Sequence, residues 1–304
     1  MYPTISYLIK DLTGWWIPLP LQTFGVLLAL SFWAGAVALK SELKRKEHES
    51  LISFYINRKG EIVYPHQDVG TIVFLAAIWG IIGARVFSIL EYFQDFLDDP
   101  IGTLLSMSGL TFYGGLVFAA IAILYYTRKR GVKTVYMLDA AAPALMLSYA
   151  IGRIGCQLAG DGDWGIDNLF PKPNWLGFLP NWAWAYNYPH NVIREGIPIA
   201  GCVDKYCAVL QYPVFPTPLY EVIMCSFLFL ILWVIRKQIT TPGMLFCIYL
   251  IMNGTERFLI EQIRIDSEYH FFGMAVKQAE LISALLVLTG ISGMFYVRYS
   301  IRKN

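Results

Sequence analysis

The stretch Pro218–Ile235 reads PLYEVIMCSFLFLILWVI, and it carries no charged residue after Glu221. A helix needs about 20 mostly apolar residues to cross the ~30 Å hydrocarbon core of a bilayer. The basic pair Arg236 and Lys237 follows the run directly, as is common where a span meets the cytoplasmic surface. The stretch therefore predicts a transmembrane helix.

The composition of the whole chain agrees with this prediction. Of its 304 residues, 56% are hydrophobic and 15% are charged, whereas about a quarter of the residues of a soluble domain are charged. The formal net charge of +2 is too small to indicate a nucleic-acid partner. The five cysteines and four histidines show no spacing typical of a metal site, and nothing indicates a cofactor.

The chain contains six further apolar runs, four before Pro218–Ile235 and two after it, and the seven runs are numbered below in chain order. They lie at about Leu19–Leu39, Val69–Leu90, Thr103–Tyr126, Val135–Leu158, Gly243–Ile263 and Lys277–Val297. The sequence therefore predicts an all-α integral membrane protein with seven transmembrane helices. We treat residues 1–304 as a single membrane domain.

Basic clusters predict the direction of the helices. They follow the first, third, fifth and seventh runs and comprise Lys40, Lys44, Arg45 and Lys46, then Arg128, Lys129, Arg130 and Lys133, then Arg236 and Lys237, and last Arg298, Arg302 and Lys303. Seven spans place all four clusters on one side of the membrane, and the positive-inside rule makes that side cytoplasmic. We expect the N-terminus outside and the C-terminus in the cytoplasm.

The segment 159–216, between the fourth and fifth spans, is then extracytoplasmic. Its aromatic residues, such as Trp182 and Tyr186, favour an ordered head that lies on the bilayer over a flexible surface loop. Residues Pro3–Pro18 are a candidate interfacial segment on the same face. Cys202 and Cys207 share one loop of the head, and the sequence leaves open whether they pair.

Polar residues inside the predicted spans share one depth. Arg85, Arg153 and Arg257 each come late in a span that runs outward. Tyr113 comes early in a span that runs inward, and Glu221 opens the fifth span. An ionisable group inside a membrane is costly unless it is paired or hydrated, so these residues predict a shared site in the outer part of the membrane. Arginines that extend to the outer headgroups are the alternative.

The sixth span carries a polar stripe. Asn253, Arg257, Glu261 and Arg264 are spaced four, four and three residues apart, which places them on one face of a helix. Glu261 is positioned to hold an arginine side chain in place, and a guanidinium fork matches a pair of phosphate oxygens. A structural ladder of salt bridges is the other interpretation.

Several motifs in the correct order resemble those of the prolipoprotein diacylglyceryl transferase family. They are Gly83-Ala84-Arg85, Tyr113-Gly114-Gly115-Leu116, Gly152-Arg153-Ile154-Gly155 with Trp164-Gly165, Pro218-Leu219-Tyr220-Glu221, and Arg257-Phe258-Leu259-Ile260-Glu261-Gln262-Ile263-Arg264. The resemblance implies a multi-pass enzyme of the bacterial inner membrane. Such an enzyme transfers the diacylglyceryl group of phosphatidylglycerol to the lipobox cysteine of a preprolipoprotein and releases glycerol phosphate. Membrane lipids are its surroundings, and no cofactor is implied.

On this resemblance we assign two groups of candidate site residues. The catalytic candidates are Arg153, Arg257, Tyr113 and Asp161, and the substrate-binding candidates are Arg85, Arg153, Arg257, Glu261, Arg264, Gly114, Gly115 and Glu221. Fixed guanidinium groups would stabilise the leaving phosphate.

The chain departs from the family pattern where a general base would be sought. Tyr113 stands where the family usually has histidine, and Cys156 where it usually has asparagine. Asp161 and Asp163 both fit the place of a following acidic residue. Tyr113, Asp161, Asp163, Glu261 and His190 therefore stay open as the base, and we expect Cys156 to be a packing residue. A non-catalytic lipid-binding relative and a transporter for an anionic lipid or solute are the alternative functions.

Overall fold

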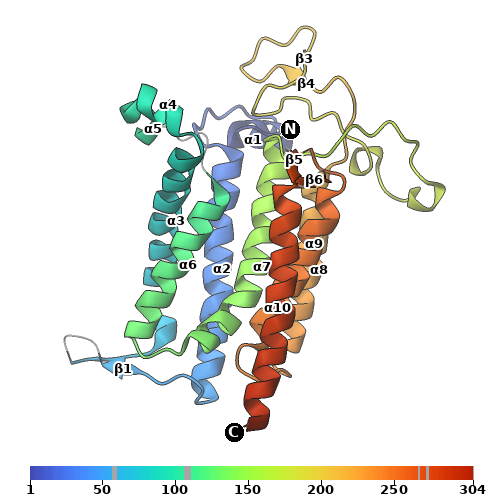
Figure 1. Ribbon diagram of the computed structural model, residues 1–304. Coiled ribbons are helices and arrows are strands. Elements are labelled where there is room, and N and C mark those ends of the chain that lie inside the picture. The colour runs from blue at the N-terminus through green and yellow to red at the C-terminus, as the bar shows by residue number, and fades with distance from the viewer. Residues whose placement is uncertain (57–59, 106–110, 266–267, 272–273, 304) are drawn as a thin grey trace. The chain divides into compact units, whose positions relative to one another are not determined.

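The computed structural model describes residues 1–304 except 57–59, 106–110, 266–267, 272–273 and 304 (Figure 1). The long helices are α2 (Thr23–His48), α3 (Val69–Glu91), α6 (Phe112–Lys129), α7 (Thr134–Ala159), α8 (Thr217–Ile235), α9 (Met244–Glu261) and α10 (Gln278–Lys303). The chain forms two compact units: one joins Met1–Gly35 to Ala142–Asn304, and the other is Ala36–Ala141. We describe each unit by itself.

Five helices in the described part of the chain are long and apolar enough to cross a membrane. They are Thr23–His48, Pro65–Glu91, Thr134–Ala159, Thr217–Ile235 and Gln278–Ser300. This confirms the prediction of an α-helical membrane protein. The other two long helices are less apolar, because α9 carries Glu256, Arg257 and Glu261, and α6 ends on Arg128 and Lys129. The full set of seven spans stays a prediction.

The predicted runs overlap these helices, with one clear difference. The third run was expected to begin near Thr103, but Thr103 belongs to a separate short helix, α5 (Pro100–Leu105), which follows α4 (Phe93–Asp98). Pro100 is suited to the first turn of a helix, and the Asp99 carboxylate accepts a hydrogen bond from the Gly102 amide at 2.9 Å. The continuous helix α6 begins at Phe112.

Helices α7, α8 and α9 share the main core of the first unit. Its centre consists of Ala142, Met146, Ala150, Cys225, Leu232 and Leu245, each nearly or fully buried. Helix α10 packs along α9, and a Cβ added at Gly254 would lie 2.8 Å from the Ser283 carbonyl oxygen. The outward faces carry large apolar side chains such as Phe227 and Leu285, which are more than half exposed. A surface of this kind suits lipid as the solvent.

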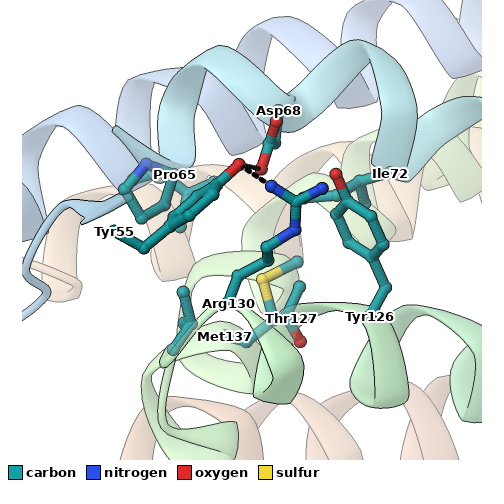
Figure 2. A pocket seen from close by; sticks show the side chains of 10 residues that line it. Tyr55, Pro65, Asp68, Ile72, Tyr126, Thr127, Arg130 and Met137 are labelled. Atoms are coloured by element: carbon teal, nitrogen blue, oxygen red, sulfur yellow. Dashed lines mark hydrogen bonds between the residues drawn. The ribbon is translucent and has the colours of Figure 1, made fainter. Parts of the chain in front are cut away.

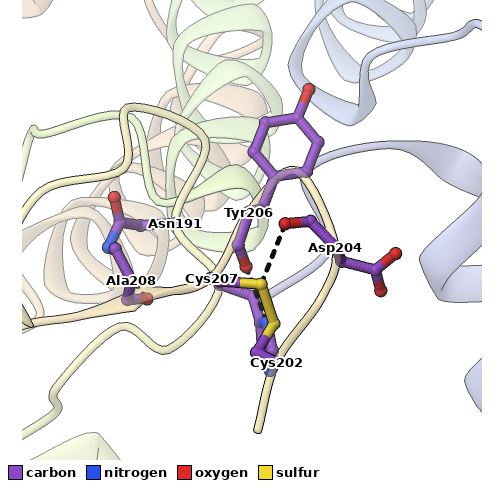
Figure 3. The surroundings of a disulfide bond; sticks show 7 residues. Asn191, Cys202, Asp204, Tyr206, Cys207 and Ala208 are labelled. Carbon is purple, nitrogen blue, oxygen red and sulfur yellow. Dashed lines mark hydrogen bonds between the residues drawn. A yellow bond between two sulfur atoms is a disulfide. The ribbon is translucent and has the colours of Figure 1, made fainter. Parts of the chain in front are cut away.

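A head segment joins α7 to α8 and has a core of its own. Trp164, Tyr188, Leu210 and Val214 form this core, so the segment is packed rather than a flexible loop. The head contains the turns η2 (Asn174–Leu176) and η3 (Asn181–Ala183) and the hairpin of β3 (Ile197–Pro198) with β4 (Ala208–Val209), in which Ile197 pairs with Val209. Cys202 and Cys207 form a disulfide, with Cα atoms 5.6 Å apart, in the loop that joins the two strands of this hairpin (Figure 3).

The two ends of the chain lie at opposite ends of the first unit. The Met1 amino group donates a hydrogen bond to the Pro189 carbonyl of the head at 3.0 Å, whereas the C-terminus lies at the far end of α10 (Figure 1). The short helix α1 (Ile5–Thr13) follows Met1, and Leu12, Trp15 and Trp16 near its end are exposed. A hairpin of β5 (Glu268–Phe271) and β6 (Met274–Lys277) joins α9 to α10.

In the second unit, α3 and α6 pack through glycines. A Cβ at Gly115 would lie 2.8 Å from the Gly80 carbonyl oxygen, and Gly83 and Gly114 face each other still more closely. These contacts explain why side chains are absent at these positions. Next to the helices lie η1 (Pro65–Asp68) and a hairpin of β1 (Tyr55–Ile56) with β2 (Ile62–Val63).

Candidate functional site

Arg153 lies near the end of α7, and its main contacts are with two carboxylates and an aromatic ring. Its Nε atom lies 3.2 Å from Oε2 of Glu221, and Nη1 pairs with the Asp163 carboxylate. Its guanidinium lies over the Tyr149 ring, 5.1 Å from the centroid. Since the Arg153 side chain is 13% exposed, these contacts hold it in a largely buried position.

Arg257 on α9 shares a partner with Arg153. Arg257 Nη1 lies 3.3 Å from Oε1 of Glu221, and Nη2 lies 3.3 Å from Oε2 of Glu261. The side chains of Glu221 and Glu261 are fully buried. The Tyr149 hydroxyl donates a hydrogen bond to Oε1 of Glu221 at 2.8 Å. The Glu221 carboxylate therefore ties α7 to α9 from its place on α8.

Arg264 follows α9 and pairs with Asp163, so Asp163 bridges Arg153 and Arg264. Lys277 supports the Arg264 backbone, since its Nζ donates to the Arg264 carbonyl at 2.7 Å and to the Glu261 carbonyl at 2.8 Å. Nη1 of Arg264 is buried and has no hydrogen-bond acceptor among the described residues. A buried guanidinium N–H without an acceptor is costly, and it is suited to an anionic ligand.

The segment that carries Asp163 follows α7 and turns sharply at two glycines. Gly160 and Gly162 have φ values of 64° and 99°, which a residue with a side chain rarely adopts. The Gly165 amide donates to the Phe215 carbonyl at 2.8 Å. The Thr217 hydroxyl donates to the Asp163 carbonyl at 2.7 Å. These bonds hold the backbone of the segment against the start of α8.

The two aspartates of this segment differ in their protonation. Burial raises the pKa of Asp161, and the neighbouring Asp163 carboxylate raises it further. Burial also opposes ionisation of Asp163, but the positive charges of Arg153 and Arg264 outweigh it and hold the pKa of Asp163 below its usual range. Asp163 is therefore an anion at neutral pH, and Asp161 holds a proton more readily than an ordinary carboxyl group.

Two further buried groups near the arginines were not predicted from the sequence. Tyr149 lies four residues before Arg153 on α7, and this spacing could have predicted their contact from the sequence. Glu256 is 1% exposed, and neither of its carboxylate oxygens has a hydrogen-bond partner among the described residues. The sequence does contain a signal for Glu256, since it is an acidic residue that lies directly before Arg257 inside an apolar run.

Cys156 and Asp161 lie next to the arginine network. Cys156 is buried, and its Sγ atom lies 3.8 Å from Nη1 of Arg153. The possible ligand atoms of Cys156, Asp161 and Asp163 lie within 4.8 Å of one another. Both oxygens of Asp163 already pair with guanidinium groups, and two such cations would repel a metal ion. We therefore assign no metal to this cluster.

Arg85, Tyr113, Gly114 and Gly115 belong to the second unit. Arg85 lies on α3, Tyr113 lies in the first turn of α6, and both side chains are half-buried. Gly114 and Gly115 pack against α3. The convergence of these four residues with Arg153 and Arg257 stays a prediction.

His190, an alternative base, is held within the head. Its Nδ1 atom lies 2.7 Å from the Tyr206 carbonyl oxygen, and its backbone has a φ of 61°. Because a carbonyl oxygen only accepts, the proton is assigned to Nδ1, which leaves Nε2 as the acceptor.

A second polar cluster lines a small pocket in the second unit (Figure 2). The Tyr55 hydroxyl donates to Asp68 and accepts from Arg130, and the Arg130 guanidinium lies 4.6 Å from the centroid of the Tyr55 ring and 4.9 Å from that of Tyr126. The polar groups satisfy one another, and they join β1 and η1 to the end of α6. This arrangement indicates a structural role.

A comparison with known families identifies the group to which the chain is related. A family model described as prolipoprotein diacylglyceryl transferase matches residues 13–296. The chain belongs to this family. Three relatives are each named phosphatidylglycerol–prolipoprotein diacylglyceryl transferase.

The relative from Chlorobaculum tepidum is 29% identical over 300 residues, which cover 92% of this chain and 92% of the relative. The protein from Dehalococcoides mccartyi is 25% identical over 280 residues, which cover 91% of this chain and 90% of the relative. The protein from Enterococcus faecalis is 30% identical over 226 residues, which cover 72% of this chain and 73% of the relative. The similarity to this family thus extends over the arginine network and the head.

Proposed function

We propose that this protein transfers the diacylglyceryl group of phosphatidylglycerol to the lipobox cysteine of preprolipoproteins. The observation that carries the proposal is the buried Glu221 carboxylate, which fixes Arg153 and Arg257 side by side. Two guanidinium groups in a largely buried site suit an anionic phosphodiester. The names of the relatives supply the same two substrates.

The reaction replaces a carbon–oxygen bond with a carbon–sulfur bond. The sulfur of the lipobox cysteine attacks the carbon of the diacylglyceryl group that is bonded to the phosphate. The bond between that carbon and the phosphate oxygen breaks, and its electron pair stays on the oxygen. Glycerol phosphate leaves with an added negative charge. Arg153 and Arg257 stabilise that charge, because fixed donors in a medium of low polarity need little reorganisation. Arg264 binds the same anion as a secondary contact, and Arg85 remains a substrate-binding residue predicted from the sequence.

The thiol must also lose its proton, since the thiolate is the nucleophile. Asp161 is our choice of acceptor, because burial and Asp163 raise its pKa toward that of the thiol. Tyr113 takes the place of the family histidine and positions the reacting groups. Gly114 and Gly115 contribute indirectly, because their close packing against α3 sets the position of the first turn of α6. Glu261 holds Arg257 in place.

We further propose seven spans, with the N-terminus and the head outside the cytoplasm of a bacterial cell and the chain in its inner membrane. The Cys202–Cys207 disulfide supports this direction, because disulfides persist in oxidising compartments. The contact between Met1 and Pro189 supports a shared side for the N-terminus and the head.

To test this proposal, the purified protein is incubated with phosphatidylglycerol vesicles and a lipobox peptide, and the mass of the peptide is then measured by mass spectrometry. The peptide is expected to gain the mass of one diacylglyceryl group, with release of one glycerol phosphate. An unchanged peptide together with normal lipid binding would indicate a non-catalytic relative. Movement of labelled lipid between leaflets without transfer would indicate a transporter.

A further inference from the structure

Among the described residues, the three arginines of the network have three carboxylate partners, namely Asp163, Glu221 and Glu261. Asp163 pairs with Arg153 and Arg264, Glu221 with Arg153 and Arg257, and Glu261 with Arg257. The positive and negative charges of this set are therefore equal. A phosphate anion that binds these guanidinium groups competes with one of the carboxylates.

The degree of burial determines which carboxylate the phosphate displaces from the arginines. The side chains of Glu221 and Glu261 are 0% exposed and belong to α8 and α9, whereas the side chain of Asp163 is 30% exposed and belongs to the loop after α7. A buried carboxylate that loses its partner costs about 3–5 kcal/mol. A carboxylate that reaches water is hydrated instead, so Asp163 is the partner that is least costly to displace.

The surroundings of Asp163 permit a movement of its side chain alone. The Thr217 hydroxyl holds the Asp163 carbonyl at 2.7 Å, and the Gly165 amide holds the Phe215 carbonyl at 2.8 Å. The backbone is thus fixed on the side of α8, while the carboxylate projects onto two guanidinium groups. Rotation about χ1 releases both ion pairs without opening the loop.

The geometry of Asp163 also resembles that of a bound phosphodiester. Its two oxygens bind two different arginines, with Oδ2 on Arg153 and Oδ1 on Arg264. The free oxygens of a phosphodiester present a similar pair of acceptors. Nη1 of Arg264 still lacks an acceptor among the described residues, and the larger phosphate group has further oxygens with which to satisfy it.

We propose that Asp163 is an exchangeable internal anion, which gives up Arg153 and Arg264 to the phosphate of an anionic lipid headgroup and returns as glycerol phosphate leaves. This inference rests on the proposed function, because it takes the lipid phosphate as the ligand of the arginines. Exchange replaces one negative charge with another, so the buried arginines keep their neutralising partners throughout. Asp163 thereby weakens binding of the lipid and of the product and speeds product release.

The test uses the full-length protein in nanodiscs with the variant Asp163→Asn, which removes the charge and nearly keeps the shape. The Kd of glycerol phosphate and the KM for phosphatidylglycerol should each fall about tenfold, a change of about 1.4 kcal/mol. The value of kcat should fall as well, because the product leaves more slowly. Asp167→Asn, in the same segment but exposed, is the matched control and should change none of these values.

Two results would overturn the inference. One is weaker glycerol phosphate binding in Asp163→Asn, which would make Asp163 a support for the arginines. The other is an unchanged Kd and KM. If Asp163→Asn does not fold, Asp163→Ser is measured in the same way and judged by the same outcomes. Arg153→Lys separates the two proposals, because normal glycerol phosphate binding in that variant contradicts the phosphate-binding role itself, whatever Asp163 does.

Discussion

The Glu221 carboxylate and the Arg257 guanidinium lie 3.3 Å apart, although Glu221 belongs to α8 and Arg257 to α9. The same carboxylate lies 3.2 Å from Arg153 on α7. One fully buried anion thus fixes the separation of two cations. Because Glu221 lies at the start of α8, a third helix links the arginines of α7 and α9.

Glu221→Ala should therefore destabilise the protein and abolish transfer. Removal of one partner from a buried ion pair costs about 3–5 kcal/mol, because the remaining charges are left uncompensated. Thermal unfolding in detergent measures the first effect, and the mass of the lipobox peptide measures the second. Glu195→Gln, at an exposed position of the head, is the control and should leave both unchanged. A Glu221→Ala protein with normal stability would contradict the bridging role.

Arg153→Lys and Arg257→Lys should each reduce transfer by about a hundredfold or more, a loss of about 3 kcal/mol of transition-state stabilisation. Lysine keeps the charge but loses the fork that binds two oxygens. Both variants should still insert and fold, as judged by gel filtration and circular dichroism. Arg298→Lys, which is exposed on α10, is the matched control. Near-normal transfer in both variants would refute the phosphate-binding role.

Cys156→Asn should keep activity within a few-fold of the parent, because Cys156 packs against the network rather than forming a covalent intermediate. Asparagine is also what the family usually carries at this position. Mass spectrometry of the parent after incubation with phosphatidylglycerol should find no lipid on Cys156. A trapped adduct, together with complete loss of activity in the variant, would make Cys156 a nucleophile.

Asp161 should control the acidic limb of the pH–rate profile. A base acts in its deprotonated form, so the rate should rise as the pH passes upward through the pKa of Asp161, which lies above that of an ordinary aspartate. Asp163→Asn removes a neighbouring negative charge and should shift this limb to lower pH, because the pKa of Asp161 then falls. Asp161→Asn should eliminate the limb and most of the activity. An unchanged profile in Asp161→Asn would assign the base elsewhere.

The sequence predicted the helices and the pairing of Arg257 with Glu261, because both follow from spacing along a single helix. It was wrong to extend the stripe to Arg264, because α9 ends at Glu261. Arg257 and Glu261 pair four residues apart, as their positions indicate. The bridge from Asp163 to Arg264 spans 101 residues of sequence and depends on how the head folds back onto α9. No local pattern contains that information. The late start of α6 was missed for a different reason: Asp99 and Pro100 lie just before the apolar run and begin a separate short helix, which includes the first residues of that run.

Tyr113 is the residue at which this chain departs most from its family, and its role is the last prediction. Tyr113→Phe removes the hydroxyl and nearly preserves packing, so it should lower kcat while the KM for phosphatidylglycerol stays unchanged. The parent's pH–rate profile should lack the ionisation near neutrality that a catalytic histidine gives. Tyr136→Phe, on α7 of the same unit, is the control for loss of a phenol hydroxyl. Full activity of Tyr113→Phe would remove it from the reaction, and a neutral ionisation that disappears in His190→Ala would assign the base to His190.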